Sequence, residues 1–399
     1  ILLFILSSGV IDTRNKYQNN YSEIALFSYV DMYRFTVNLI LISVFLLGMP
    51  LVGVWLAGHE LETYLVFPHL TSPMQHEPFS WFAWFAMAGF IFVVLAFFVY
   101  AVNFRSIRQS QVSNQRQSRL PWWGILGVIL VIIFWILAWN RFAWFTDFQV
   151  YTFTPIWLGY ILVINALTHS RRGYCLLTRE PLYLLSLFLL SAIFWWYYEY
   201  LNIFIRNWHY VGTEKLTTAE IIIHSSFAYA TVLPAVLSTA EWLHTFPRLD
   251  LASQQRWELQ VSLPRSWAVA SWLGGSITLG LATLWPEILF PMVWIAPLFV
   301  VAGLKYLLEG KTIFSVLGRG DWQPVLLLAL AALCCGFFWE LWNVNSFAHW
   351  EYSVPYVQAF HLFEMPLLGY AGYLPFGLVC LAIADLLPGT HRILNTQAE

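Results

Sequence analysis

The sequence predicts an all-α integral membrane protein with about ten transmembrane helices. Of its 399 residues, 59% are hydrophobic and 11% are charged, whereas soluble domains carry about 25% charged residues. The apolar residues form long runs between charged breaks, and roughly 20 mostly apolar residues suffice for a helix to cross a bilayer. Backbone polar groups that face lipid must be hydrogen-bonded within the chain, so these runs are expected to be helices.

Ten apolar runs are the candidate helices. They cover residues 36–57, 79–102, 121–139, 153–169, 182–205, 219–242, 266–285, 288–307, 323–345 and 357–388. Residues 1–35 are more polar and are predicted to be a tail, or an extension upstream of a start at Met32 or Met49. They are left out of the predicted fold.

The placement of basic residues predicts the orientation. Only Arg141, Arg206 and Lys215 fall in one alternating set of loops, which leaves 17 of the 20 Lys and Arg residues on the other side. Basic loops stay in the cytoplasm, so the sequence predicts an inner-membrane protein with both termini cytoplasmic. The expected partners are membrane lipids, and a net charge of −2 gives no attraction to nucleic acid.

An internal repeat gives the chain further order. Segment 199–237 matches segment 340–378 at a constant offset of 141 residues, and both contain the pattern E-x-x-N followed by Y-A-x-x-L-P-x-x-L. The matched pairs are Glu199 and Glu340, Asn202 and Asn343, Tyr229 and Tyr370, Ala230 and Ala371, Leu233 and Leu374, Pro234 and Pro375, and Leu237 and Leu378. Each E-x-x-N also precedes a W-x-Y triplet, beginning at Trp208 and at Trp350, with a shift of one residue.

The repeat predicts the domain organisation. Two parallel four-helix modules, residues 121–245 and 266–388, follow a two-helix N-terminal unit, residues 36–120. Each module has an even number of spans, so both run in the same direction about a pseudo-twofold axis along the membrane normal. Pro234 and Pro375 are expected to kink their helices, or to be tolerated as prolines commonly are in membranes.

The duplicated E-x-x-N motifs are the first candidate site. Spacing i, i+3 places Glu199 with Asn202, and Glu340 with Asn343, on one face of a helix. A carboxyl group within a membrane helix is costly, and it usually faces the bundle interior or a water-filled cavity. The two Glu residues are therefore candidates for acid or base chemistry, or for structural pairing that locks the modules together.

Further polar and aromatic residues are predicted near the same outer ends. His224 in one module, and His361 with Glu364 in the other, are candidate acid–base groups, although helix capping or simple pairing explains such residues equally well. Four aromatic residues are candidates for ligand binding or for an interfacial aromatic belt, namely Trp208, Trp350, Tyr229 and Tyr370. Asn202 and Asn343 are grouped with them. No recognised metal motif occurs, so no metal site is predicted, and the sequence names no cofactor.

Three runs carry a resemblance to known proteins. FFWELWN at 337–343, VPYVQAFHLFEMPLLGYAGYLPF at 354–376 and HEPFSW at 76–81 resemble an uncharacterised family of bacterial polytopic membrane proteins. No activity is known for that family, so the resemblance implies none for these residues.

Two classes of function remain open, beside a purely structural one. The first is an enzyme or binding protein for a lipophilic small molecule, with a carboxylate, His and aromatic site on the outer side. The alternative is a transporter with its site between the parallel repeats, or a structural subunit of a membrane complex. No P-loop or other phosphate-binding glycine pattern is present, which argues against ATP hydrolysis.

Overall fold

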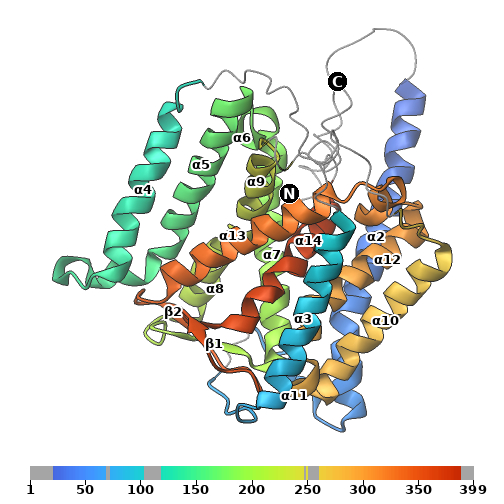
Figure 1. The fold of residues 1–399 in the computed structure, drawn as a ribbon. Coiled ribbons are helices and arrows are strands. Elements are labelled where there is room, and N and C mark those ends of the chain that lie inside the picture. Colours follow the sequence, from blue (N-terminus) through green and yellow to red (C-terminus); the bar gives the residue numbers. More distant parts are fainter. Residues whose placement is uncertain (1–20, 69–71, 103–117, 247–248, 250–259, 388–399) are drawn as a thin grey trace.

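The computed structural model describes residues 21–68, 72–102, 118–246, 249 and 260–387, with the backbone alone for 21–35 and 98–102. The described chain is mostly helical (Figure 1). Seven of its helices are long and apolar enough to cross a membrane, or up to nine spans if each of two bent pairs counts as one. The expectation of a mostly helical chain with several apolar helices long enough to cross a membrane is thus confirmed, whereas a count of ten spans stays a prediction.

The long helices are α2 (Tyr21–Leu56), α3 (Trp81–Val102), α4 (Trp122–Trp139), α5 (Phe153–Arg172), α7 (Pro181–Ile205), α8 (Thr218–Tyr229), α9 (Val232–Leu243), α10 (Arg265–Leu284), α12 (Ala296–Glu309), α13 (Gln323–Asn343) and α14 (Tyr373–Ala384). The shorter ones are η1 (Leu61–Tyr64), η2 (Ala143–Tyr151), α6 (Leu176–Arg179), α11 (Pro286–Leu289), η4 (Phe290–Trp294), η5 (Ile313–Arg319) and η6 (Leu367–Gly372). Four short strands are β1 (Trp208–Val211), β2 (His349–Tyr352), β3 (His361–Leu362) and β4 (Met365–Pro366). Helix α2 begins well before the predicted residue 36, and residues 1–20 of the predicted tail lie outside the described residues.

The helices form two flanks around a central group. Helices α4 and α5 pair on one flank, and α10 packs against α12 and α2 on the other (Figure 1). Both flanks use glycine for close approach: a Cβ at Gly159 would lie 2.8 Å from the carbonyl oxygen of Gly127, and one at Gly275 would lie 2.8 Å from that of Ala296. Small residues let membrane helices approach closely, and α7, α9, α13 and α14 fill the space between the flanks.

The chain breaks where the two matched prolines were expected to kink it. Helix α8 ends at Tyr229 and α9 begins at Val232, so Pro234 is the third residue of α9. Pro375 is likewise the third residue of α14, which follows the 3₁₀ helix η6. A proline is tolerated in the first turn because its missing N–H would have no partner in the helix. Both prolines therefore stand in the first turn of a new helical segment, at a break within one candidate span.

The final predicted helix, residues 357–388, is wrong at its start. Phe360 and Phe363 have positive φ angles of 56° and 57°, and β3 pairs with β4 in a small hairpin before the helical part begins at Leu367. His361 is a strand residue and Glu364 lies in the hairpin turn. Although the predicted helix 357–388 includes both residues, they do not share a helix face.

Candidate functional site: two buried carboxyls beside an apolar cavity

A pair of strands brings the two W-x-Y triplets together. Strand β1 pairs with β2 in antiparallel register, with Trp208 opposite Tyr352 and Tyr210 opposite Trp350. Successive side chains of a strand point to opposite faces, so each triplet directs its Trp and Tyr to one face. Aromatic residues favour such half-buried strands, but no strand was predicted from the sequence here.

Asn202 and Asn343 hold the strands against their helices. The side-chain oxygen of Asn202 accepts hydrogen bonds from the backbone N–H groups of Asn207 (2.8 Å) and Trp208 (3.3 Å), and its Nδ2 donates to the Trp208 carbonyl (2.7 Å). Asn343 makes the equivalent pair of bonds with the backbone of Trp350, at 2.8 Å and 2.7 Å. Each amide therefore fixes the start of a strand to the end of a helix.

Glu199 is buried behind the aromatic face, with 1% of its surface exposed. Its Oε1 accepts hydrogen bonds from the Tyr210 hydroxyl (2.6 Å), the Trp195 indole (3.0 Å) and the Trp208 indole (3.3 Å). The Tyr229 hydroxyl donates to that of Tyr210 (3.2 Å). Burial, and then the nearby Glu199 carboxyl, raises the pKa of Tyr210 well above its usual value, so this phenol stays protonated and donates.

Glu340 is buried in the same way, with 0% exposure. Its Oε1 accepts from the hydroxyls of Tyr373 (2.7 Å) and Tyr352 (2.8 Å), and the Trp350 indole donates to the Tyr352 hydroxyl (2.9 Å). Burial and the Glu340 carboxyl raise the pKa of Tyr352 well above its usual value. Within the described part of the chain, neither Glu199 nor Glu340 forms an ion pair.

A cavity of about 940 Å³ lies on the other side of this aromatic layer. Its walls come from α3, α8, α13, η6, α14, η4 and the two strands, so elements of both predicted modules and of the N-terminal unit enclose it. The Trp and Tyr residues that surround the two carboxyls also line it: Trp195, Trp208, Tyr210, Tyr229, Trp350, Tyr352 and Tyr373. The carboxyls themselves lie one layer behind this wall.

Some of the predicted site residues lie in or directly behind the cavity wall, and others lie away from it. Trp208, Tyr229, His224 and Trp350 line the cavity, and Glu199 and Glu340 lie behind it. His361 is exposed on the β3–β4 hairpin. Tyr370 lies in η6 and donates its hydroxyl to the carbonyl of Leu362 (3.1 Å).

Two parts of the site were missed from the sequence. Tyr373 donates to Glu340, although the offset of 141 points to Tyr370 as the counterpart of Tyr229. Helix α3 forms one cavity wall through residues such as Ala83, Met87 and Phe90, although it was assigned to a separate unit. The aromatic residues of both segments can be read from the sequence, but no sequence pattern predicts their distance from the carboxyls.

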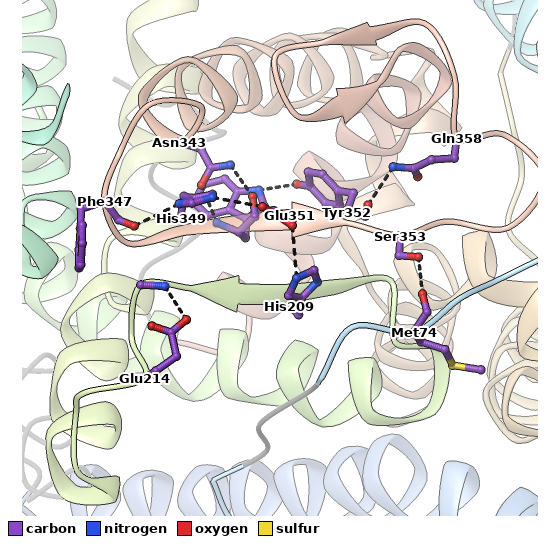
Figure 2. Close-up of polar contacts among 12 residues, drawn as sticks. Met74, His209, Glu214, Asn343, Phe347, His349, Glu351, Tyr352, Ser353 and Gln358 are labelled. Carbon is purple, nitrogen blue, oxygen red and sulfur yellow. Dashed lines mark hydrogen bonds and ion pairs between the residues drawn. The ribbon is translucent and has the colours of Figure 1, made fainter. Parts of the chain in front are cut away.

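The other face of the strand pair carries a polar cluster. The Glu351 carboxylate lies between two imidazoles, 3.4 Å from His209 Nε2 and 3.5 Å from His349 Nε2 (Figure 2). The Ser353 hydroxyl next to it donates to the Met74 carbonyl (2.7 Å), which ties the strand to the chain before α3. In the residues described, no group of three or more His, Cys, Asp and Glu side chains is arranged to hold a metal ion.

Comparison with known proteins gives no match: no protein-family model, no curated protein and no solved structure is similar to this chain.

Proposed function

We propose that the protein binds a lipophilic molecule of the membrane in the cavity between its helices. The observation that carries this proposal is the cavity itself, with a volume of about 940 Å³ and a lining of aliphatic and aromatic side chains. Binding sites for small molecules are typically about 300–1,000 Å³, mostly apolar, with a few placed polar groups. A membrane-embedded chain meets such ligands in the surrounding lipid.

The polar residues have separate roles in this proposal. Glu199 and Glu340 fix the tyrosines of the wall by accepting their hydrogen bonds. His224 offers a polar group within the apolar lining. We assign His361 no part in binding, because it lies on the exposed hairpin. Glu199 and Glu340 keep their proposed acid–base role, which acts through the tyrosines that donate hydrogen bonds to them.

Transport is the second candidate. It is favoured by the position of the cavity, which is lined by residues of both halves, and by the breaks before α9 and α14 at its edge. A carrier would expose the cavity alternately to the two sides of the membrane. A binding protein or enzyme would keep access from one side.

The finer architecture belongs to the same proposal. Two parallel modules are supported by helices α9 and α14, each 12 residues long with proline at the third position, and by strands β1 and β2, which begin 141 residues apart (349 − 208). We further propose that the chain is a bacterial inner-membrane protein with both termini in the cytoplasm, on the basis of its basic loops.

Bound lipid tests the proposed binding function. The full chain is purified in a mild detergent, and co-purifying lipids are extracted and quantified by mass spectrometry. Ala83→Phe and Ala329→Phe place a ring in the cavity and are expected to lower the amount of specifically retained lipid severalfold. Ala96→Phe is the matched control, since Ala96 is exposed on the same helix as Ala83 and does not line the cavity. Equal lipid retention by all three variants would overturn the proposal.

A further inference from the structure

The cavity lining carries no permanent charge. Among the described residues that enclose it there is no Asp, Glu, Lys or Arg. Elsewhere in the bundle a buried charge has a partner: Lys305 Nζ lies 3.0 Å from an Asp385 carboxylate oxygen. A phosphate or carboxylate headgroup in the cavity would have no such partner, and an unpaired charge away from water is strongly disfavoured. The lining therefore selects against charged lipids.

The hydrogen-bond donors of the aromatic wall are already used within the protein. Tyr210 donates a hydrogen bond to Glu199, and Tyr352 and Tyr373 donate hydrogen bonds to Glu340. The Tyr229 hydroxyl donates a hydrogen bond to the Tyr210 hydroxyl, and the Trp350 indole donates one to the Tyr352 hydroxyl. A ligand that only accepts hydrogen bonds finds these donors taken, whereas a hydroxyl group can donate one.

Polar groups of the lining that remain open to a ligand include the Asn207 side-chain oxygen, which is buried without a hydrogen-bond partner, and His224. Its imidazole forms no hydrogen bond or ion pair with any described residue, and its one ring contact is edge-on to Tyr151, with centroids 5.3 Å apart. The other imidazole of the lining, that of His349, faces the Phe347 carbonyl (3.1 Å) and the Glu351 carboxylate (3.5 Å). A neutral imidazole has one donor and one acceptor nitrogen, which matches the two capacities of a hydroxyl group.

We propose that the ligand is an uncharged lipid alcohol whose hydroxyl group binds the imidazole of His224 while its hydrocarbon part fills the cavity. This inference rests on the proposed binding function and narrows it to one chemical class. It excludes phospholipids and fatty acids as occupants, because their headgroups are charged.

Matched photoreactive probes test the inference. Three probes share one hydrocarbon chain with a diazirine and differ only in the end group, which is a hydroxyl, a methyl ether or a sulfonate. Each is added to the full chain in detergent, irradiated, and the labelled peptides are identified by mass spectrometry. The alcohol should label α3, α8 and α14. The sulfonate should label them roughly tenfold less because its charge is unpaired, and the ether about fivefold less because it cannot donate.

Two variants locate the hydroxyl contact. His224→Phe should reduce labelling by the alcohol more than labelling by the ether, because a hydroxyl group can pair with either imidazole nitrogen and an ether only with the protonated one. His224→Gln, which keeps a donor and an acceptor, should retain most of the labelling by the alcohol.

Each outcome has a distinct meaning. Equal labelling by sulfonate and alcohol would overturn the uncharged class, and equal labelling by ether and alcohol, or an unaffected His224→Phe, would overturn the hydroxyl contact, with the binding function intact. If no probe labels the cavity segments, or if Ala329→Phe leaves all labelling unchanged, the proposed function itself fails.

Discussion

The two buried carboxyls share a motif but differ in their donors. The Glu199 carboxyl accepts hydrogen bonds from the Tyr210 phenol and from two indoles, and its second tyrosine, Tyr229, donates to the Tyr210 hydroxyl. The Glu340 carboxyl accepts hydrogen bonds from two phenols, Tyr352 and Tyr373, and the Trp350 indole donates to the Tyr352 hydroxyl. The strand pair therefore fixes the donors that the two sites have in common, Tyr210 and Tyr352. The second tyrosine of each site, Tyr229 or Tyr373, is placed by the segment that leads into α9 or α14.

The cause of the difference is local backbone structure. In the first half, the continuous α-helix α8 carries Tyr229 up to the break before α9. In the second half, a hairpin and the 3₁₀ helix η6 occupy the same place, and Tyr373 is the first residue of α14. Equal spacing in the sequence thus leads to different partners, because the two segments have different rise and turn per residue.

Removing a carboxyl is expected to have the largest effect on stability. Glu199→Leu leaves three donors without an acceptor, and Glu340→Leu leaves two. Each buried donor left unpaired costs about 1–3 kcal/mol, so Glu199→Leu should lower the free energy of unfolding more than Glu340→Leu does. Thermal unfolding of the purified protein, followed by tryptophan fluorescence, measures the order.

The matched controls are Glu199→Gln and Glu340→Gln, which keep an oxygen acceptor at each position. They should lose much less stability than the leucine variants. If leucine and glutamine behave alike at either position, the carboxyl oxygen does not organise its aromatic donors, and the comparison of the two sites loses its basis.

The second tyrosines give a smaller and sharper comparison. Tyr373→Phe removes a direct bond to Glu340 and should cost about 1.5–3 kcal/mol when that carboxyl is ionised, as expected for a bond to a charged group. Tyr229→Phe removes a bond between two phenols and should cost about 0.5–1.5 kcal/mol. Unfolding midpoints of the two variants decide the order, and an equal or larger loss for Tyr229→Phe would show that its hydroxyl stabilises the Glu199 site by more than its bond to Tyr210.

The same comparison explains what the sequence could predict. Composition and apolar runs identify the helical membrane fold, and the repeated E-x-x-N with its W-x-Y triplet locates both carboxyl sites, because these residues keep nearly the same spacing in both halves. The antiparallel pairing of β1 with β2 could not be predicted, since it joins segments from the two halves.

The errors have equally physical causes. Residues 357–366 carry a single charged residue and run directly into an apolar segment, so the sequence predicts one span from 357 to 388 and no hairpin. That error placed His361 and Glu364 on a helix. The offset of 141 residues separately selected Tyr370, whereas Tyr373 is bonded to the carboxyl. Hydrophobicity alone does not distinguish such a hairpin from the first turns of a helix.

The outer face of the strand pair extends the comparison and offers the smallest expected effect. The one-residue shift between the triplets makes His209 and Glu351 counterparts (351 − 209 = 142), and the antiparallel register places them opposite each other, 3.4 Å apart. A strictly identical repeat would place two like residues at these positions, and like charges directly opposite are destabilising. The divergence of His and Glu turns a strand contact between equivalent segments into a complementary pair.

Swapping the two residues tests this complementarity. Glu351→His places His opposite His and should cost no more than about 1 kcal/mol, since the Glu351 side chain is 46% exposed and such pairs are weak. Adding His209→Glu restores an opposite pair in reversed order and should recover part of the loss, as measured by the unfolding midpoint. If the double variant is less stable than Glu351→His alone, the contact depends on each residue's own surroundings, such as the His349 imidazole beside Glu351, and not on opposite charge across the strands.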